Sequence, residues 1–105
     1  MTRRPRRLSS AAEAVLEVML EKPTDAHYGL ELMSRTRRPS GTMYPLLRTL
    51  EQRGLIGSEW ENIDPSQAGR PRRMLYRLTG HGEPARAALR ANRTSVRPFR
   101  AVGVS

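Results

Sequence analysis

The chain has 105 residues, no cysteine, no continuous apolar run of membrane-spanning length, and a formal net charge of +9. It is long enough for one small domain with a modest core, and the lack of cysteine excludes a disulfide scaffold and a thiolate zinc site. Without a signal-peptide core or a membrane span, we expect a soluble cytoplasmic protein with no membrane partner.

The positive charge is distributed unevenly along the chain. Residues 8–34 contain five acidic side chains and one lysine, whereas residues 62–78 contain four arginines and one aspartate. This asymmetry is typical of a molecule that presents one positive surface to a polyanion. Nucleic acid, an acidic protein and an anionic membrane surface all satisfy that description, so the charge alone does not distinguish them.

Residues 1–8 form a basic arm that we expect to be flexible. A helix is predicted from a capping box formed by Ser10 and Glu13 to about Glu21, before Pro23. Apolar residues cover roughly two thirds of its circumference at 100° per residue, which is more than one core-facing side requires. We interpret the surplus as a contact with a second subunit, and deeper burial inside the monomer is the alternative.

A second helix is predicted from Thr24 or Asp25 to about Arg35, with Tyr28 and Leu32 facing inward. The basic loop RTRRPSG connects it to a third helix. Two short helices joined by a tight loop, with polar residues displayed on the second, are typical of a helix-turn-helix.

The third helix contains a proline near its N-terminus. The N–H groups of a first turn have no intrahelical partner, so we place Pro45 at the third helical position, behind an N-cap at Thr42. Ser40 is the second candidate for the cap. Gly54 favours the left-handed conformation that ends a helix, so this element extends from about Thr42 to Arg53.

This third helix has two different sides at 100° per residue. The apolar stripe consists of Met43, Leu46, Leu47 and Leu50, and the opposite side displays Pro45, Arg48 and Gln52. An uncharged front end followed by an arginine suits a helix that enters a DNA groove, since phosphate would repel a carboxylate there. An ordinary amphipathic surface helix is the alternative.

Alternating residues predict two strands after the third helix, from Ile56 to Trp60 and from Met74 to Leu78. The segment between them, ENIDPSQAGRPRR, is too long for a tight turn and is rich in arginine. A long basic hairpin next to a helix-turn-helix is a wing, and we expect Trp60 to close the core beneath it.

A final helix is predicted from about Gly82 to Ala91, behind a cap at Thr79, and residues 93–105 form a flexible basic tail. The predicted fold class is α+β, mainly α: a winged helix-turn-helix with three helices, a two-stranded β wing and a C-terminal helix. Residues 9–92 form this winged-helix domain.

Three strings carry a resemblance to a known family: HYGLELM, SGTMYPLLRTLEQRGLIGSEWE and GRPRRMLYRLTGHGEPARAAL. They cover about residues 15–89 and resemble the PadR family of winged-helix transcriptional regulators. The resemblance implies that the third helix enters the DNA major groove, that the wing contacts the neighbouring backbone or minor groove, and that the first and last helices form a homodimer. Most such proteins are repressors released by a small molecule, so a small-molecule effector is a further candidate partner.

The candidate DNA-binding residues lie in the loop, the third helix and the wing: Arg38, Ser40, Gly41, Thr42, Tyr44, Arg48, Gln52, Arg70, Arg72 and Arg73. We expect Arg48 to read a base, with a phosphate contact as an equal alternative. The hydroxyls at the front of the helix would hold phosphate, and the wing arginines would grip it, unless they are a solvated charge run. The candidate dimer-interface residues are Val15, Val18, Met19 and Leu89.

No nucleophile, base and orienting acid occur at a recognisable spacing, so we expect no enzyme activity. His27 and His81 lie far apart in the sequence, and we expect neither a metal nor a cofactor. The expected function is that of a sequence-specific DNA-binding transcriptional regulator, a ligand-responsive repressor that binds double-stranded DNA as a homodimer. The alternatives are a winged-helix protein that binds RNA or DNA non-specifically and a protein-interaction module.

Overall fold

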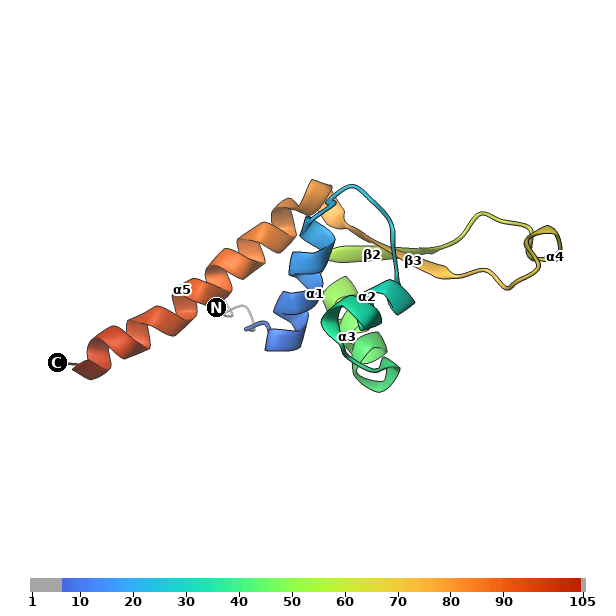
Figure 1. Ribbon diagram of the computed structural model, residues 1–105. Helices are drawn as coiled ribbons and strands as arrows, with labels where there is room; N and C mark the ends of the chain where they lie inside the picture. The colour runs from blue at the N-terminus through green and yellow to red at the C-terminus, as the bar shows by residue number, and fades with distance from the viewer. Residues whose placement is uncertain (1–6, 105) are drawn as a thin grey trace.

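The computed structural model describes the backbone of residues 7–104 and the side chains of residues 7–94. Figure 1 shows a helical body from which a hairpin projects on one side and a long C-terminal helix on the other. This architecture confirms the predicted winged helix-turn-helix. The basic arm predicted over residues 1–8 lies outside the described residues except for Arg7 and Leu8. No helix in the described part of the chain is long and apolar enough to cross a membrane.

The first helix, α1 (Ser10–Leu20), begins one residue earlier than predicted. Its N-cap is Ser9, whose hydroxyl accepts a hydrogen bond from the N–H of Ala12 at 3.1 Å. Glu13 does not complete a capping box, because its carboxylate accepts a hydrogen bond from the side-chain amide of Asn92 instead. Asn92 also pairs with both backbone groups of Leu8, at 2.8 and 3.2 Å, so Leu8 is buried rather than part of a free arm.

A short strand that the sequence did not predict, β1 (His27–Tyr28), moves the start of α2 (Gly29–Thr36) several residues along the chain. The two residues pair with Tyr76 and Leu75, so their backbone is bonded in a sheet and not in a helix. The predicted start of this helix at Thr24 or Asp25 is therefore wrong. Two residues are too few to show the alternation that identifies a strand.

The third helix, α3 (Ser40–Gln52), begins behind an N-cap at Pro39, so the predicted N-cap at Thr42 is wrong. The carbonyl of Pro39 accepts hydrogen bonds from the N–H groups of Thr42 at 3.0 Å and Met43 at 2.9 Å. Pro45 consequently lies beyond the first turn and has no N–H to donate to the carbonyl of Gly41. Both residues are exposed, so water can hydrate that carbonyl. The helix ends close to the predicted position, before Gly54 with its φ of +77°.

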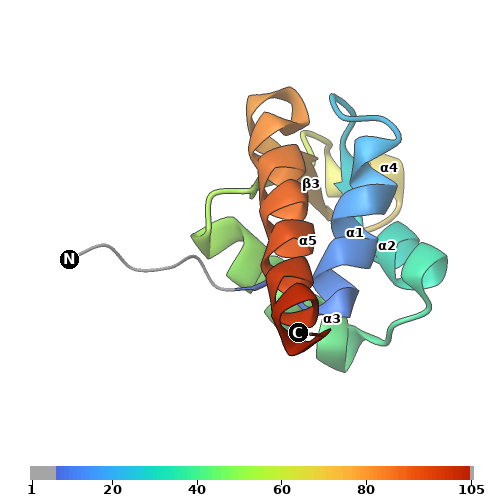
Figure 2. The same cartoon turned by 90° about the vertical axis from the view of Figure 1, so that its left-hand side faces the viewer.

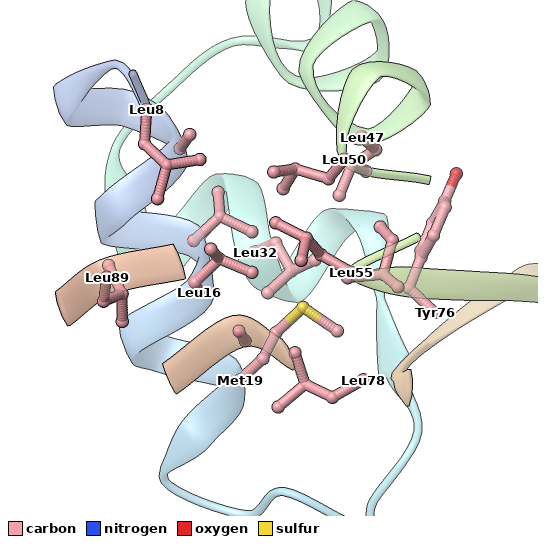
Figure 3. Packing of buried hydrophobic residues seen from close by; sticks show 14 of the residues in the cluster. Leu8, Leu16, Met19, Leu32, Leu47, Leu50, Leu55, Tyr76, Leu78 and Leu89 are labelled. Carbon is pink, nitrogen blue, oxygen red and sulfur yellow. The ribbon is translucent and has the colours of Figure 1, made fainter. Parts of the chain in front are cut away.

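One hydrophobic core lies between α1, α2, α3 and the sheet. Figure 3 shows its buried side chains, which include Leu16, Met19, Leu32, Leu47, Leu50, Leu55 and Leu78. Figure 2 shows the C-terminal helix α5 alongside α1, where Ala85 and Leu89 join the same core. The core anchors three side chains of α3, and this anchoring determines which side of α3 faces solvent.

The hairpin consists of β2 (Ile56–Trp60) and β3 (Met74–Leu78), whose register from Ile56–Leu78 to Trp60–Met74 confirms the predicted strands. The sheet has the order β1-β3-β2. The loop between the two strands contains a short helix, α4 (Pro65–Ala68), at the tip of the wing (Figure 1). The side chain of Trp60 is 62% exposed, so the expectation that it closes the core is wrong. Trp60 is the last residue of β2 and belongs to the last strand pair before the loop of the wing.

The C-terminal part of the chain also differs from the prediction. Thr79 does not cap the last helix, because its hydroxyl donates to the carbonyl of Gly54 at 2.7 Å and so joins the end of α3 to the end of β3. A 3-10 turn, η1 (Thr79–Gly82), precedes α5 (Glu83–Val104), which continues well past the predicted end at Ala91. Gly82, with a φ of +93°, packs so closely on Leu20 that a Cβ atom there would approach its side chain to 2.8 Å.

Candidate nucleic-acid interface

The outward side of α3 carries the residues that the sequence predicted for DNA binding. Met43, Leu47 and Leu50 are buried, which confirms the predicted apolar stripe. The exposed residues of α3 include the predicted ones, which are Ser40, Gly41, Thr42, Tyr44, Pro45, Arg48 and Gln52, and also Thr49 and Glu51. The helix therefore presents a continuous polar surface, with its uncharged N-terminal turn at one end.

Arg48 is the one arginine on this outward side of α3. Among the side chains of residues 7–94, none forms a hydrogen bond or an ion pair with it. The acidic residue of the same helix, Glu51, accepts a hydrogen bond from the hydroxyl of Ser58 in β2 at 2.7 Å. The guanidinium of Arg48 is thus available to an external acceptor, while the nearby carboxylate is directed towards the hairpin.

Tyr44 is 44% exposed and lies against the N-terminus of α2. A Cβ atom on Gly29 would lie 2.9 Å from the Tyr44 hydroxyl, so only glycine allows the ring to approach this closely. A shallow pocket of about 150 Å³ lies beside the ring and is lined by residues of β1, α2, α3, β3 and the end of the wing loop: Tyr28, Gly29, Leu30, Tyr44, Arg73, Met74 and Tyr76. The fold therefore brings the front of α3 next to the base of the wing.

The predicted wing arginines have different surroundings. Arg70 is half-buried and forms an ion pair with Glu61, with its Nη1 2.7 Å from Oε1. Arg72 is exposed, and its Nε donates to the carbonyl of Ile63 at 3.0 Å across the loop. Arg73 is also exposed, and its guanidinium lies 5.2 Å from the centre of the Tyr28 ring. Arg72 and Arg73 keep unpaired guanidinium surface, whereas the charge of Arg70 is largely neutralised within the wing.

Sequence reasoning missed Glu61, although it is 7% exposed and central to the wing. Its carboxylate accepts hydrogen bonds from two nitrogens of Arg70 at 2.7 and 3.1 Å, from the backbone N–H of Arg73 at 2.9 Å, and from the Tyr28 hydroxyl at 3.0 Å. The hydrogen bonds from Arg70 have the largest effect on the pKa of Glu61 and lower it, burial raises it, and the bonds from Arg73 and Tyr28 lower it again. The net result is a pKa of about 2. The available signal was a glutamate directly before an arginine-rich loop, although Glu59 lies two residues earlier and the sequence does not distinguish the two.

Acidification is expected to destabilise the fold through this carboxylate. Its pKa is 4.5 ordinarily and about 2 in the folded chain, so the unfolded chain binds more protons in this interval. The stabilisation is complete above pH 4.5 and is lost as the pH falls towards 2. Unfolding in urea across this range should show a fall in stability that is smaller in Glu61→Gln, and identical pH profiles for the two chains would contradict the assignment.

The remaining predicted residues are placed as follows. Arg38 is half-buried, and its Nη1 donates to the carbonyl of Thr36 at 3.1 Å, next to the start of α3. Val15 and Met19 have no exposed surface and Leu89 is 6% exposed, so these three side chains pack mainly in the core of the monomer. Of the four predicted interface residues, only Val18 is partly exposed.

A second surface hollow lies between α1 and α5. It has a volume of about 410 Å³ and is lined by Glu17, Leu20, Glu21, Arg86, Leu89, Arg90 and Arg93. Acidic residues from α1 thus face basic residues from α5. Arg93 approaches Glu17 to 3.9 Å, which leaves most of this charge exposed.

A helix-turn-helix with an outward polar third helix, next to a basic β hairpin, defines the class of winged-helix DNA-binding proteins. The chain belongs to the transcriptional regulator PadR-like family, whose profile matches residues 15–88, more than half of its length. It is therefore a DNA-binding transcriptional regulator and not an enzyme. No curated protein sequence matches the chain significantly.

Solved structures of other regulators have the same fold. A possible transcriptional regulator from Methanosarcina mazei Go1 has a TM-score of 0.61 and 14% identity, over 92% of this chain and 77% of that one. A mutant of S. aureus MepR has a TM-score of 0.64 and 19% identity, over 93% and 67% of the two chains. Lactococcus lactis ZitR, a zinc-responsive MarR family member, has a TM-score of 0.61 and 16% identity, over 95% of this chain and 64% of its own. The chain thus spans less than two thirds of ZitR.

Proposed function

We propose that this regulator is a sequence-specific repressor that binds duplex DNA as a homodimer and is released by a small molecule. The observation that carries the proposal is the outward side of α3, where Arg48 has no partner among the described side chains and Glu51 is bonded to Ser58. The family supports DNA binding. Repression, dimerisation and the effector rest on the resemblance to that family.

In the proposed complex α3 lies in the major groove. The guanidinium of Arg48 donates two hydrogen bonds to O6 and N7 of a guanine, which is worth about 1–3 kcal/mol of discrimination against other bases. Ser40 and Thr42 lie in the first turn of α3, where hydroxyls and backbone N–H groups suit a phosphate. Arg72 and Arg73 contact the phosphates of the next backbone segment from the wing.

The proposed dimer uses the exposed surface of α1 and α5 and not the buried residues that the sequence suggested. Acidic side chains on α1 and basic side chains on α5 line one hollow, so two copies related by a two-fold axis would place each set against the other. The two α3 helices of such a dimer would enter successive major grooves about 34–36 Å apart. We place this protein in the cytoplasm.

The test is a comparison of Arg48→Ala with Arg72→Ala. Duplexes selected by the native chain from a random pool should contain two-fold symmetric sites with a preferred guanine in each half. Arg48→Ala should relax the preference at that guanine by about 1–3 kcal/mol, since a base contact is lost. Arg72→Ala should weaken binding to selected and random duplexes by the same factor, since a phosphate contact carries no sequence information.

The alternatives predict different outcomes of the same experiment. If both substitutions weakened selected and random duplexes equally, α3 would not read bases, and non-specific binding of DNA or RNA would describe the protein better. If the native chain enriched no sequence and bound no duplex, the positive surface would serve a protein partner instead.

A further inference from the structure

The wing extends far from the core and contains no apolar cluster of its own. None of residues 62–72, all of which the structure describes, is buried. The last strand pair of the hairpin is Trp60–Met74, followed by one further hydrogen bond from the N–H of Glu61 to the carbonyl of Arg73 at 2.9 Å. Beyond this point, polar contacts must contribute most to the position of the wing, because no side chain there is buried and Ile63 is the one partly buried apolar residue in 62–72.

The most buried of these polar contacts is the carboxylate of Glu61, which connects three segments of the chain. Arg70 binds it from the returning arm of the wing, and the N–H of Arg73 binds it from the residue before β3. The Tyr28 hydroxyl binds it from β1, which belongs to the body and leads directly into α2. Charge-assisted hydrogen bonds to a carboxylate of low exposure are strong and directional, so this group couples the direction of the wing to the helix-turn-helix.

We propose that Glu61 is a positioning residue that holds the wing at the angle at which Arg72 and Arg73 reach the DNA backbone. The inference rests on the proposed function and assigns a role to a residue that does not contact DNA. Arg70 acts with Glu61 in this role, because its guanidinium is occupied by the carboxylate. The guanidinium of Arg73 over the Tyr28 ring is a second contact between the wing and β1 and supports the same arrangement.

Glu61→Gln tests the proposal, with Glu59→Gln as its matched control. Both substitutions remove one negative charge from the same hairpin, but Glu59 is exposed and its carboxylate lies 3.6 Å from Arg77, away from the wing contacts. If charge alone mattered, both variants would bind DNA slightly more tightly. We expect Glu59→Gln to behave this way and Glu61→Gln to bind more weakly than the native chain, by at least the factor that Arg72→Ala costs.

A double-mutant cycle distinguishes positioning from a general loss of fold. In the Glu61→Gln chain, adding Arg72→Ala should weaken binding by less than about twofold, since the wing no longer holds Arg72 at the DNA. Adding Arg48→Ala should still have its full effect, because α3 is anchored by the core. An undiminished effect of Arg72→Ala, or equal losses for both additions, would overturn the proposal. Tyr28→Phe removes one hydrogen bond to the Glu61 carboxylate with less risk to folding. Like Glu61→Gln, it should weaken DNA binding and reduce the effect of adding Arg72→Ala.

Amide hydrogen exchange keeps this proposal separate from the proposed function, because it needs no DNA. The N–H groups of Glu61 and Arg73 should exchange faster in Glu61→Gln than in Glu59→Gln, while those of α3 remain unchanged. Unchanged exchange at the wing would overturn the positioning role, whatever the chain binds. Faster exchange in a chain whose native form binds no duplex would instead overturn the proposed function alone.

Discussion

Raising the salt concentration from about 50 to about 200 mM is expected to weaken the binding of duplex DNA by about 10³-fold. We assign phosphate contacts to Arg72 and Arg73 of the wing and also to Arg38, which lies next to the start of α3. These amount to about six contacts in a dimer, and each displaces a condensed counterion from the DNA. The net charge of +9 adds attraction at longer range. Fluorescence anisotropy with a labelled duplex at a series of salt concentrations measures how the binding constant changes with salt.

Arg72→Ala provides the control for this prediction. It removes one phosphate contact from each subunit. The slope of the logarithm of the binding constant against the logarithm of the salt concentration should therefore become shallower by about two for a dimer. Arg70→Ala is not expected to act in the same direct way, because the charge of Arg70 is already paired with Glu61. Binding that hardly changes with salt would contradict the phosphate contacts assigned to the wing.

Leu47→Ala is expected to lower the free energy of unfolding by about 2–5 kcal/mol. The side chain of Leu47 is 1% exposed and packs in the core, so truncation leaves a cavity. A domain of this kind is stable by only about 5–15 kcal/mol, so much of its margin would be lost. Urea unfolding followed by circular dichroism measures the difference.

The next residue along the helix is the matched control. Arg48 is exposed, so Arg48→Ala should change the free energy of unfolding by no more than about 0.5 kcal/mol while it alters DNA recognition. The two adjacent substitutions thus separate the inward and outward sides of α3. Comparable destabilisation by both would mean that Arg48 is packed inside the molecule, and the description of this helix as a reading surface would fail.

The orientation of α3 and the hairpin could be predicted because each depends on a repeating pattern. Met43, Leu47 and Leu50 recur at helical spacing, and these residues are buried as that spacing requires. The alternation in 56–60 and 74–78 likewise corresponds to the observed strands. The motifs shared with the PadR family placed these elements in the correct order, and the family match covers nearly the same residues.

The ends of the elements were less predictable, because they depend on contacts between distant residues. The N-terminus of α1 differs from the prediction because Ser9 is the N-cap, and the carboxylate of Glu13 bonds to Asn92, far along the chain. The strand β1 exists only because β3 lies beside it. The predicted burial of Trp60 failed because alternation shows which residues share a side of a strand, but not how far the helices cover it.

The arginines of the wing show the same limit at the candidate site. From the sequence, Arg70, Arg72 and Arg73 are equivalent members of one basic run. In the structure, the turn at α4 and Gly69 brings Arg70 back to Glu61, nine positions earlier in the chain, and so removes one charge from the binding surface. The roles assigned to Arg38, Arg48, Arg72 and Arg73 in DNA binding remain predictions.

The position of β3 between β1 and β2 has a consequence for the choice of operator. Backbone hydrogen bonds run from the wing through β3 to β1, and β1 continues directly into the helix-turn-helix. Because these hydrogen bonds connect the wing to the helix-turn-helix, we expect the two to approach a duplex as one rigid unit. If the spacing of α3 and the wing differs from the spacing of the groove and the phosphates, the DNA must bend or twist to fit. The energy of that deformation depends on dinucleotide steps that no side chain touches. Preferred operators should therefore share flexible base steps between the positions read by α3 and the phosphates held by the wing.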